Sequence, residues 1–170
     1  MENRLSDEKI SAVFKRLLHG GSLLGVEDTA IIFYDLSFLE NRIDDLINLF
    51  PSSTLHAIAI KANPLHKILR RVGKLGVGLE AASLPELHIA VNAGYSPDKI
   101  VFDSPTKTIP ELEYALAMGV HINADSLSDL DRISKLIKDK QPKGTIGVRI
   151  NPQVGTGRIL STSVAGEYSK

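Results

Sequence analysis

Five short apolar segments of this chain are each followed directly by side chains that can do acid–base or covalent chemistry. The set contains an amine, carboxylates and a guanidinium, so it could bind and transform a small charged molecule. When apolar strands lie parallel, their carboxyl ends meet at one edge of the sheet, and polar groups there form a common site. One such group could follow a strand by chance, whereas five in succession indicate a charge-balanced site. The groups begin at Lys61, Glu80, Asp103, Asp125 and Arg149.

Lys61 has the most specific chemistry of this set. It directly follows the apolar run of residues 57–60, so a strand that ends there is expected to leave the Lys61 amine partly desolvated. Desolvation disfavours the ammonium form, and the free amine is a nucleophile that condenses with carbonyls, including aldehyde cofactors. The alternative is a lysine that extends its ammonium into solvent from the strand end. The local pattern alone favours that alternative.

The elements that would position these side chains alternate between strand and helix. From residue 55 onward, apolar runs recur at a period of about 22 residues, with amphipathic helical patterns between them, and this alternation is typical of a parallel sheet. Capping boxes at residues 83–86 and 108–111, and a weaker version at 126–129, mark helix starts. The expected strands are 55–60, 77–79, 100–102, 121–124 and 145–150, and the expected helices are 65–75, 84–93, 109–118 and 127–137.

The segment before this repeat is expected to be helical and then extended. Ser6 is positioned to cap a first helix, and residues 30–34 are expected to form a short buried strand. Asp35 is expected to cap a second helix. The domain organisation predicted from these features is an N-terminal helix and lead-in over residues 1–29, followed by one α/β body over residues 30–170.

The number of repeats favours a closed barrel over an open sheet. An eight-stranded barrel with this period needs three strands beyond the five found here. The alternative is a complete, doubly wound open sheet, but the period is uniform and no long crossover marks a reversal of strand order. We therefore expect an α/β fold of the (β/α)8 TIM-type barrel, of which this chain carries the N-terminal part with about five parallel strands.

Composition narrows the classes of function. The chain has 20 basic and 20 acidic residues, so neither a nucleic acid nor an acidic membrane surface is expected as a partner. It has no cysteine, which excludes disulfides and a thiolate nucleophile. The five histidines show no metal-binding spacing, and no metal site is expected. The longest apolar runs fall far short of the roughly 20 residues that cross a bilayer. These features predict a cytoplasmic globular chain that acts on a small molecule.

Residues 57–64, which include Lys61, resemble the lysine motif of the fold-type III pyridoxal-phosphate decarboxylases, the family of the diaminopimelate, ornithine and arginine decarboxylases. Other segments resemble further motifs of that family in the same order along the chain. The resemblance spans about residues 30 to 170, and it implies an alanine-racemase-like barrel with pyridoxal 5'-phosphate as the cofactor. The further matching segments are 78–87, 99–107, 119–126, 148–152 and 161–170.

The resemblance implies a role for each matching residue. Lys61 would condense with the cofactor aldehyde, and Arg149 would approach the cofactor's phenolic oxygen. Glu80 stands where the family usually has aspartate. Ser83 and Glu86 match the family's Ser-x-x-Glu, but a helix cap explains both equally well. The expected catalytic residue is Lys61, and the expected cofactor-binding residues are Lys61, Glu80, Ser83 and Arg149.

Several nearby polar residues have a simpler structural interpretation. Asn63 is expected to fix the turn before Pro64 rather than to contact the cofactor. Asp103 and Asp125 either belong to the site or merely solvate the strand ends. Lys107 is expected to lie at the surface.

The activity that the resemblance implies is a pyridoxal-phosphate-dependent carboxy-lyase (decarboxylase) that acts on a small amino acid. Conversion of meso-diaminopimelate to L-lysine is the best match. The alternatives are decarboxylation of ornithine, lysine, arginine or a carrier-bound amino acid, and a non-catalytic pyridoxal-phosphate-binding barrel. Such enzymes have a second, β-sheet domain and form homodimers. We therefore expect the 170-residue chain alone to bind the cofactor weakly and to release no CO2.

Overall fold

The chain divides into two compact units, Met1–Ile43 and Asp44–Lys170. The division falls within helix α2, Leu36–Asn48. The expected boundary after residue 29 stays a prediction. The structure, a computed structural model, describes residues 6–20, 27–138 and 141–150.

Helix α1, Asp7–His19, is the main element of the first unit. It begins where the sequence predicts, because the Ser6 side chain accepts a hydrogen bond from the backbone N–H of Lys9 at 3.4 Å. The Lys9 ammonium forms an ion pair with Asp35 at 3.0 Å. The Asp35 carboxylate also accepts a hydrogen bond from the Phe38 N–H at 3.0 Å, which confirms Asp35 as the cap of α2.

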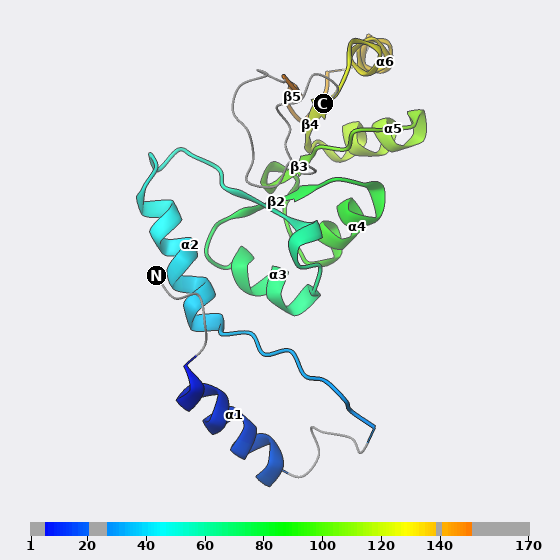
Figure 1. The fold of residues 1–170 in the computed structure, drawn as a ribbon. Helices are drawn as coiled ribbons and strands as arrows, with labels where there is room; N and C mark the ends of the chain where they lie inside the picture. The colour runs from blue at the N-terminus through cyan, green and yellow to red at the C-terminus, as the bar shows by residue number, and fades with distance from the viewer. Residues whose placement is uncertain (1–5, 21–26, 139–140, 151–170) are drawn as a thin grey trace. The chain divides into compact units, whose positions relative to one another are not determined.

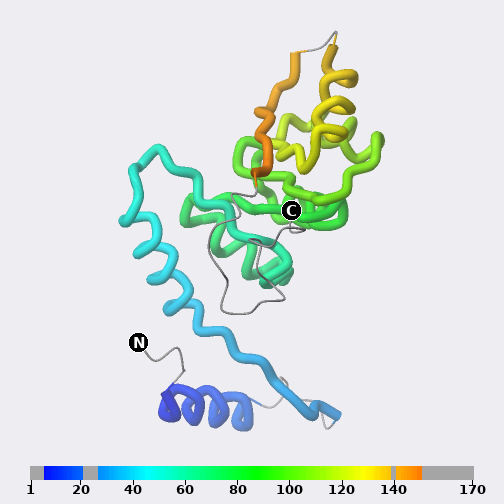
Figure 2. Tube along the Cα trace, turned by 45° about the horizontal axis from the view of Figure 1, so that its top comes forward, coloured from blue at the N-terminus to red at the C-terminus, as the bar shows by residue number. Residues whose placement is uncertain are grey.

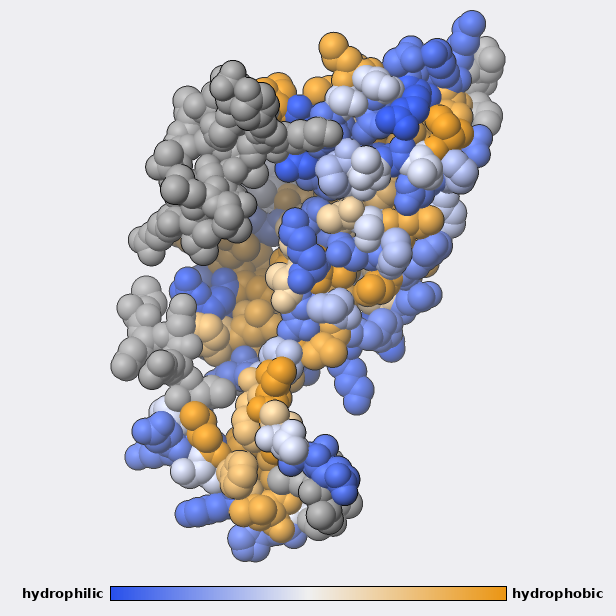
Figure 3. Space-filling model, turned by 45° about the vertical axis from the view of Figure 1, so that its right-hand side comes forward, coloured by the Kyte–Doolittle hydropathy of each residue, from blue (hydrophilic) through white to orange (hydrophobic). Residues whose placement is uncertain are grey.

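The strand expected at residues 30–34 does not form, so that prediction is wrong. Within the described part of the chain, this segment pairs with no strand, and Ile31, Ile32 and Tyr34 are exposed. An extended segment without a hydrogen-bonded neighbour lacks the ladder that stabilises a strand. Exposed apolar side chains of this kind appear orange in the space-filling view (Figure 3).

The second unit contains a parallel five-stranded sheet whose strands follow chain order (Figure 1). This order confirms the predicted βα repeat. Over the described strands it also excludes the reversal of strand order that a doubly wound sheet requires. The strands are β1 Ala57–Ala59, β2 Gly78–Ala81, β3 Ile100–Phe102, β4 His121–Ala124 and β5 Ile146–Val148.

Helices connect the strands and begin shortly after the strand ends. Thr108 and Glu111 form the complete capping box expected at the start of α5, in which the Thr108 N–H donates to Glu111 Oε2 at 2.7 Å. Gly119 ends α5 with φ of 82°, a conformation that glycine adopts without a Cβ clash. None of the helices in the described part of the chain is both long and apolar enough to cross a bilayer. The helices are α3 His66–Gly73, α4 Leu84–Asn92, α5 Ile109–Met118 and α6 Leu127–Ile137.

Alternate residues of each strand point to opposite faces of the sheet. On one face, Leu79, Phe102 and Ile122 are fully buried and form a core with residues of α4, α5 and α6. These helices lie along that side of the sheet in both ribbon and tube views (Figures 1 and 2). The opposite face carries Glu80 and Asn123, which are half-buried. Polar strand residues therefore lie on the face away from the helical core.

Candidate active site

The polar groups predicted at the strand ends lie at the carboxyl edge of one parallel sheet. Strands β4 and β5 end in register, so Asp125 and Arg149 leave the sheet side by side. Glu80 does not follow the strand, as predicted, but is the third residue of β2, where it is paired with β1 on one side and with β3 on the other. Lys61 follows β1 and Asp103 follows β3. The fold therefore brings to one edge the groups that the spacing predicted would meet there.

Lys61 lies in a short 3-10 helix, Ile60–Ala62, that follows β1 directly. Ile60 is fully buried and anchors this turn. Asn63 Oδ1 accepts a hydrogen bond from the Leu65 N–H at 3.2 Å, which confirms the turn-forming role expected of Asn63. Lys61 itself is exposed, so the expectation of a partly desolvated amine is wrong for this chain. The reason is that the turn directs Ile60, and not Lys61, into the core.

Glu80 is influenced by four other charged groups at this edge of the sheet. Its carboxyl group is half-buried on β2, and this burial raises its pKa above the ordinary value of 4.5. The positive charges of Lys61 and Arg149 lower the pKa, whereas the negative charges of Asp103 and Glu86 raise it further. These groups therefore lie within electrostatic reach of one carboxyl group, as in sites that hold or transfer protons.

Replacing Glu80 by glutamine is expected to stabilise the chain at neutral pH. Because the pKa of Glu80 is higher in the folded than in the unfolded chain, folding favours the protonated form. The stability linked to that proton is present below the unfolded pKa and is lost as the pH rises through the folded pKa. Glu80→Gln should therefore melt at a higher temperature than the native chain at about pH 7 and lose the advantage below about pH 4, as measured by circular dichroism.

Glu113→Gln is the matched control for this comparison, because Glu113 is an exposed residue of α5. It should leave the melting temperature unchanged at every pH. An advantage of Glu80→Gln that persisted in acid would not depend on ionisation and would contradict the prediction. A gain at neutral pH would fit a residue retained for function at the expense of stability.

Arg149 is held by two contacts with the end of β4. Its backbone N–H donates to the Ala124 carbonyl at 2.9 Å, and its Nη1 lies 3.2 Å from Asp125 Oδ1 in an ion pair. The Asp125 side chain is 1% exposed and the Arg149 side chain is 32% exposed. Asp125 is therefore a buried partner that orients the guanidinium, and not a solvated strand-end carboxylate.

Ser83 and Glu86 both take part in capping α4. Ser83 Oγ accepts a hydrogen bond from the Glu86 N–H at 3.4 Å, and Glu86 Oε2 accepts one from the Ala82 N–H at 2.8 Å. Ser83 is thus confirmed as the cap of α4, whereas the expected capping box is incomplete because Glu86 accepts from the Ala82 N–H and not from the Ser83 N–H. A cofactor-binding role for Ser83 stays a prediction.

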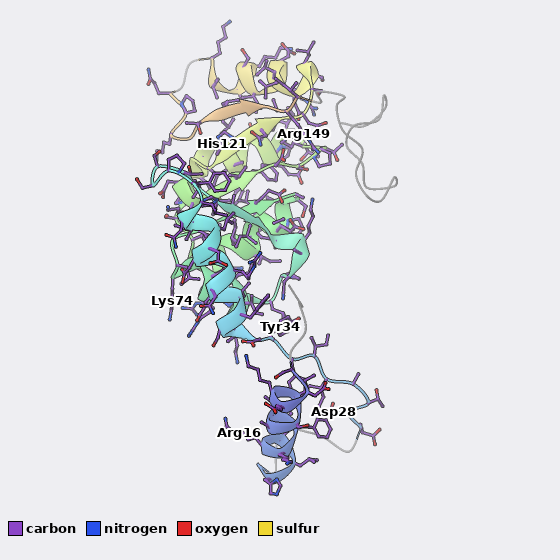
Figure 4. All side chains as sticks on the ribbon, turned by 60° about the vertical axis from the view of Figure 1, so that its left-hand side comes forward. Arg16, Asp28, Tyr34, Lys74, His121 and Arg149 are labelled. Atoms are coloured by element: carbon purple, nitrogen blue, oxygen red, sulfur yellow. The ribbon has the colours of Figure 1, made fainter. Side chains whose placement is uncertain are left out.

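A hydrogen-bond network on β4 was missed by the sequence reasoning. His121 Nε2 lies 2.8 Å from Asn123 Oδ1, and His121 Nδ1 lies 2.6 Å from Thr145 Oγ1. The network is at the start of β4, whereas Arg149 follows the end of β5 (Figure 4). The available signal was the spacing of His121, Asn123 and Asp125, because residues two apart in a strand share a face.

The expectation that Lys107 lies at the surface is wrong. Its side chain is fully buried, and its Nζ donates to Asp129 Oδ2 at 2.9 Å and to the Ser104 carbonyl at 2.6 Å. A buried ammonium requires such partners because the loss of hydration is costly. The partner, Asp129, is the acidic residue of the weaker capping motif at residues 126–129. That motif was the only feature of the sequence that could have indicated the burial of Lys107.

The last expected motifs lie outside the described residues. They comprise Asn151 and the end of the fifth motif, and the Ser/Thr-rich segment within residues 161–170. The candidate site described here is therefore formed by residues between Lys61 and Arg149.

The described residues fit a pyridoxal-phosphate site. Lys61 offers an exposed amine to an aldehyde, and Arg149 offers a partly exposed guanidinium to an anionic oxygen. Asp103 Oδ1 is buried and accepts no hydrogen bond from the part of the chain that the structure describes. A buried acceptor of this kind is normally satisfied by a polar partner, so the edge of the sheet has an acceptor to offer a polar ligand.

Comparisons with known proteins agree with this fit. Residues 36–170 match the family model described as the pyridoxal-binding domain of pyridoxal-dependent decarboxylases. Over 113 residues the chain is 38% identical to a diaminopimelate decarboxylase of Methanothermobacter thermautotrophicus, covering 66% of this chain and 26% of that protein. Over 154 residues it is 29% identical to an L-glutamyl-acyl-carrier-protein decarboxylase of Niallia circulans, covering 90% of this chain and 34% of that protein.

The fold agrees with that of solved decarboxylases. The structure of Helicobacter pylori diaminopimelate decarboxylase, complexed with L-lysine, matches with a TM-score of 0.80 and 25% identity, over 92% of this chain and 39% of that chain. The prediction of an alanine-racemase-like barrel fold is thereby confirmed. This chain spans between a quarter and two fifths of the length of these three relatives. Because the family model matches most of its length, the chain belongs to the pyridoxal-dependent decarboxylases, whose cofactor is pyridoxal phosphate.

Proposed function

We propose that this chain carries the lysine-bearing part of a pyridoxal-phosphate-dependent amino-acid decarboxylase whose substrate is meso-diaminopimelate. The observation that carries the proposal is the placement of Lys61, Glu80 and Arg149 at one edge of a parallel sheet, where both cations act on the Glu80 carboxyl group. Membership of the decarboxylase family supports the same reaction class.

Each of these side chains has a definite task in the proposed reaction. When bound, pyridoxal phosphate supplies an aldehyde for amines and a ring that accepts the electron pair left by departing CO2. Lys61 provides the amine that condenses with the aldehyde. Arg149, oriented by Asp125, holds an anionic oxygen in place. Glu80, whose pKa is raised by burial and neighbouring acids, can hold a proton close to Lys61.

Two of the relatives support diaminopimelate as the substrate, since both are diaminopimelate decarboxylases and one was solved with L-lysine, the product of that reaction. A carrier-bound amino acid is the second candidate. It is supported by the similarity to the acyl-carrier-protein decarboxylase, which extends over nine tenths of this chain. Action as a cytoplasmic homodimer stays a prediction.

Competition at Lys61 would test the proposed substrate. The chain is incubated with pyridoxal phosphate and one amino acid, reduced with borohydride, and the Lys61 peptide is quantified by mass spectrometry. An amine that is recognised displaces Lys61 from the cofactor and lowers the labelled fraction. Meso-diaminopimelate should lower it at a smaller concentration than ornithine or arginine.

Equal competition by all three amino acids would contradict the proposed specificity. Alanine serves as the control for an amine with no second polar end. We expect no CO2 from diaminopimelate incubated with the 170-residue chain alone, and CO2 release would refute the prediction that the chain alone is inactive.

A further inference from the structure

Lys107 and Asp129 form a buried ion pair, which the partly exposed Arg132 joins to make a charged cluster beside the candidate site. The side chains of Lys107 and Asp129 are 0% and 2% exposed, and Lys107 Nζ lies 2.9 Å from Asp129 Oδ2. Arg132 Nη2 lies 2.7 Å from Asp129 Oδ1, and Arg132 Nη1 donates to the Lys107 carbonyl at 2.8 Å. Every side chain of the cluster is thus bound to another member.

The cluster also holds the loops that follow β3 and β4. Lys107 Nζ donates to the carbonyl of Ser104, in the loop after β3, at 2.6 Å. Asp129 Oδ2 accepts a hydrogen bond from the backbone N–H of Asp125, directly after β4, at 3.3 Å. One carboxylate oxygen therefore connects the buried ammonium to the backbone at the edge of the site.

Asp125 links the cluster to the candidate site. Its backbone is bound to Asp129, and its side chain forms the ion pair that orients Arg149 at 3.2 Å. A continuous set of contacts therefore runs from Lys107 through Asp129 and Asp125 to the guanidinium of Arg149. Such indirect partners commonly decide how well a directly binding group is placed.

A contribution to stability does not by itself explain why an ion pair is buried at these positions. Apolar residues of similar volume often replace a buried ion pair without loss of stability. They cannot, however, accept the hydrogen bond that the Asp125 N–H donates to Asp129 Oδ2. An apolar pair could therefore replace the packing of Lys107 and Asp129, but not the hydrogen bond that fixes the Asp125 backbone.

We propose that Lys107 and Asp129 are a positioning pair, which fixes Asp125 and thereby aims the Arg149 guanidinium at the cofactor. The cofactor part of this inference rests on the proposed function. The effect on Arg149 does not, because the contacts belong to the chain itself.

The test compares three variants of the full chain. Lys107→Met/Asp129→Leu removes both charges and leaves an apolar pair that is expected to fold. Asp129→Asn retains an oxygen that can accept from the Asp125 N–H. Lys135→Met, which breaks the exposed ion pair with Asp131 on the same helix, is the matched control. Circular dichroism confirms that each variant is folded.

The first readout needs no cofactor. The Nε–H resonance of Arg149, assigned from its loss in Arg149→Met, should move to the position of an exposed arginine in Lys107→Met/Asp129→Leu. It should stay in place in Asp129→Asn and in Lys135→Met. A native resonance in the double variant would overturn the proposal. If the double variant does not fold, a displaced resonance in folded Asp129→Asn would overturn it instead, and a retained one would support it.

The second readout is the affinity for pyridoxal phosphate, followed by trapping at Lys61. The double variant should bind about tenfold more weakly than the native chain, the scale seen when a supporting partner is lost. In the Arg149→Met background the same double change should have no further effect, whereas general loosening of the fold would weaken binding again. Additive losses would overturn the proposal. A displaced Arg149 resonance in a chain that never binds cofactor would refute the proposed function and leave the positioning pair intact.

Discussion

Replacement of Lys61 by alanine is expected to abolish covalent attachment of pyridoxal phosphate to this chain. Only an amine can condense with the cofactor aldehyde, so a chain without the Lys61 amine should show no borohydride-stable label in the peptide that contains position 61. Lys61 is exposed in the turn after β1, so its removal should change the unfolding free energy by less than about 0.5 kcal/mol. Loss of label would then report chemistry and not unfolding.

Two further variants make this experiment specific. Lys61→Arg keeps the positive charge but lacks an amine that condenses with aldehydes, and it should be as unlabelled as Lys61→Ala. Lys67→Ala removes another exposed lysine, in α3, and should be labelled like the native chain. Equal labelling of Lys61→Ala and the native chain would show that another amine takes the cofactor and would remove the basis of the proposed function.

The parallel sheet was predictable because its signal is local. Each apolar run, each capping residue and each helix pattern lies within a few neighbouring residues, and their repetition is enough to indicate a βα repeat. The strand ends were less well defined. Ile60 is apolar and fully buried but lies in the 3-10 turn after β1, because burial does not require ladder pairing.

Features that depend on distant partners were not predictable in the same way. Lys107 is buried because Asp129, 22 residues later, provides a carboxylate, and nothing close to Lys107 in the sequence indicates this. The run at residues 30–34 has the composition of a strand, but a strand also needs a neighbour, and composition does not reveal whether one exists. The positions of Lys61, Glu80 and Arg149 were predictable because parallel strands bring successive strand ends together.

The same dependence on a distant partner leads to a large expected effect on stability. Lys107→Met leaves the Asp129 carboxylate buried without its main counter-charge. Breaking a buried pair by removing one partner typically costs about 3–5 kcal/mol. Because Arg132 still binds Asp129, we expect a loss of about 3 kcal/mol in urea unfolding at neutral pH. Lys135→Met, in the exposed pair with Asp131, should cost less than about 1 kcal/mol.

The pH dependence provides an independent check on the cause of that loss. Burial raises the pKa of Asp129, but hydrogen bonds from Lys107 and the Asp125 N–H, with the charges of Lys107 and Arg132, outweigh it and hold the pKa below the ordinary value of 3.8. A lowered carboxyl pKa contributes stability that is present above the unfolded pKa and is lost as the pH falls through the folded pKa.

Native chain and Lys107→Met should therefore differ most at neutral pH and converge in acid. Lys107→Met has lost much of the interaction that lowers the Asp129 pKa, so it has less stability to lose when that carboxylate is protonated. Urea unfolding of both proteins from neutral pH down through the ordinary carboxyl range measures the difference directly. A gap that stays constant as the pH falls would mean that the loss comes from packing around the Lys107 side chain, and that its charge does not stabilise the fold through Asp129.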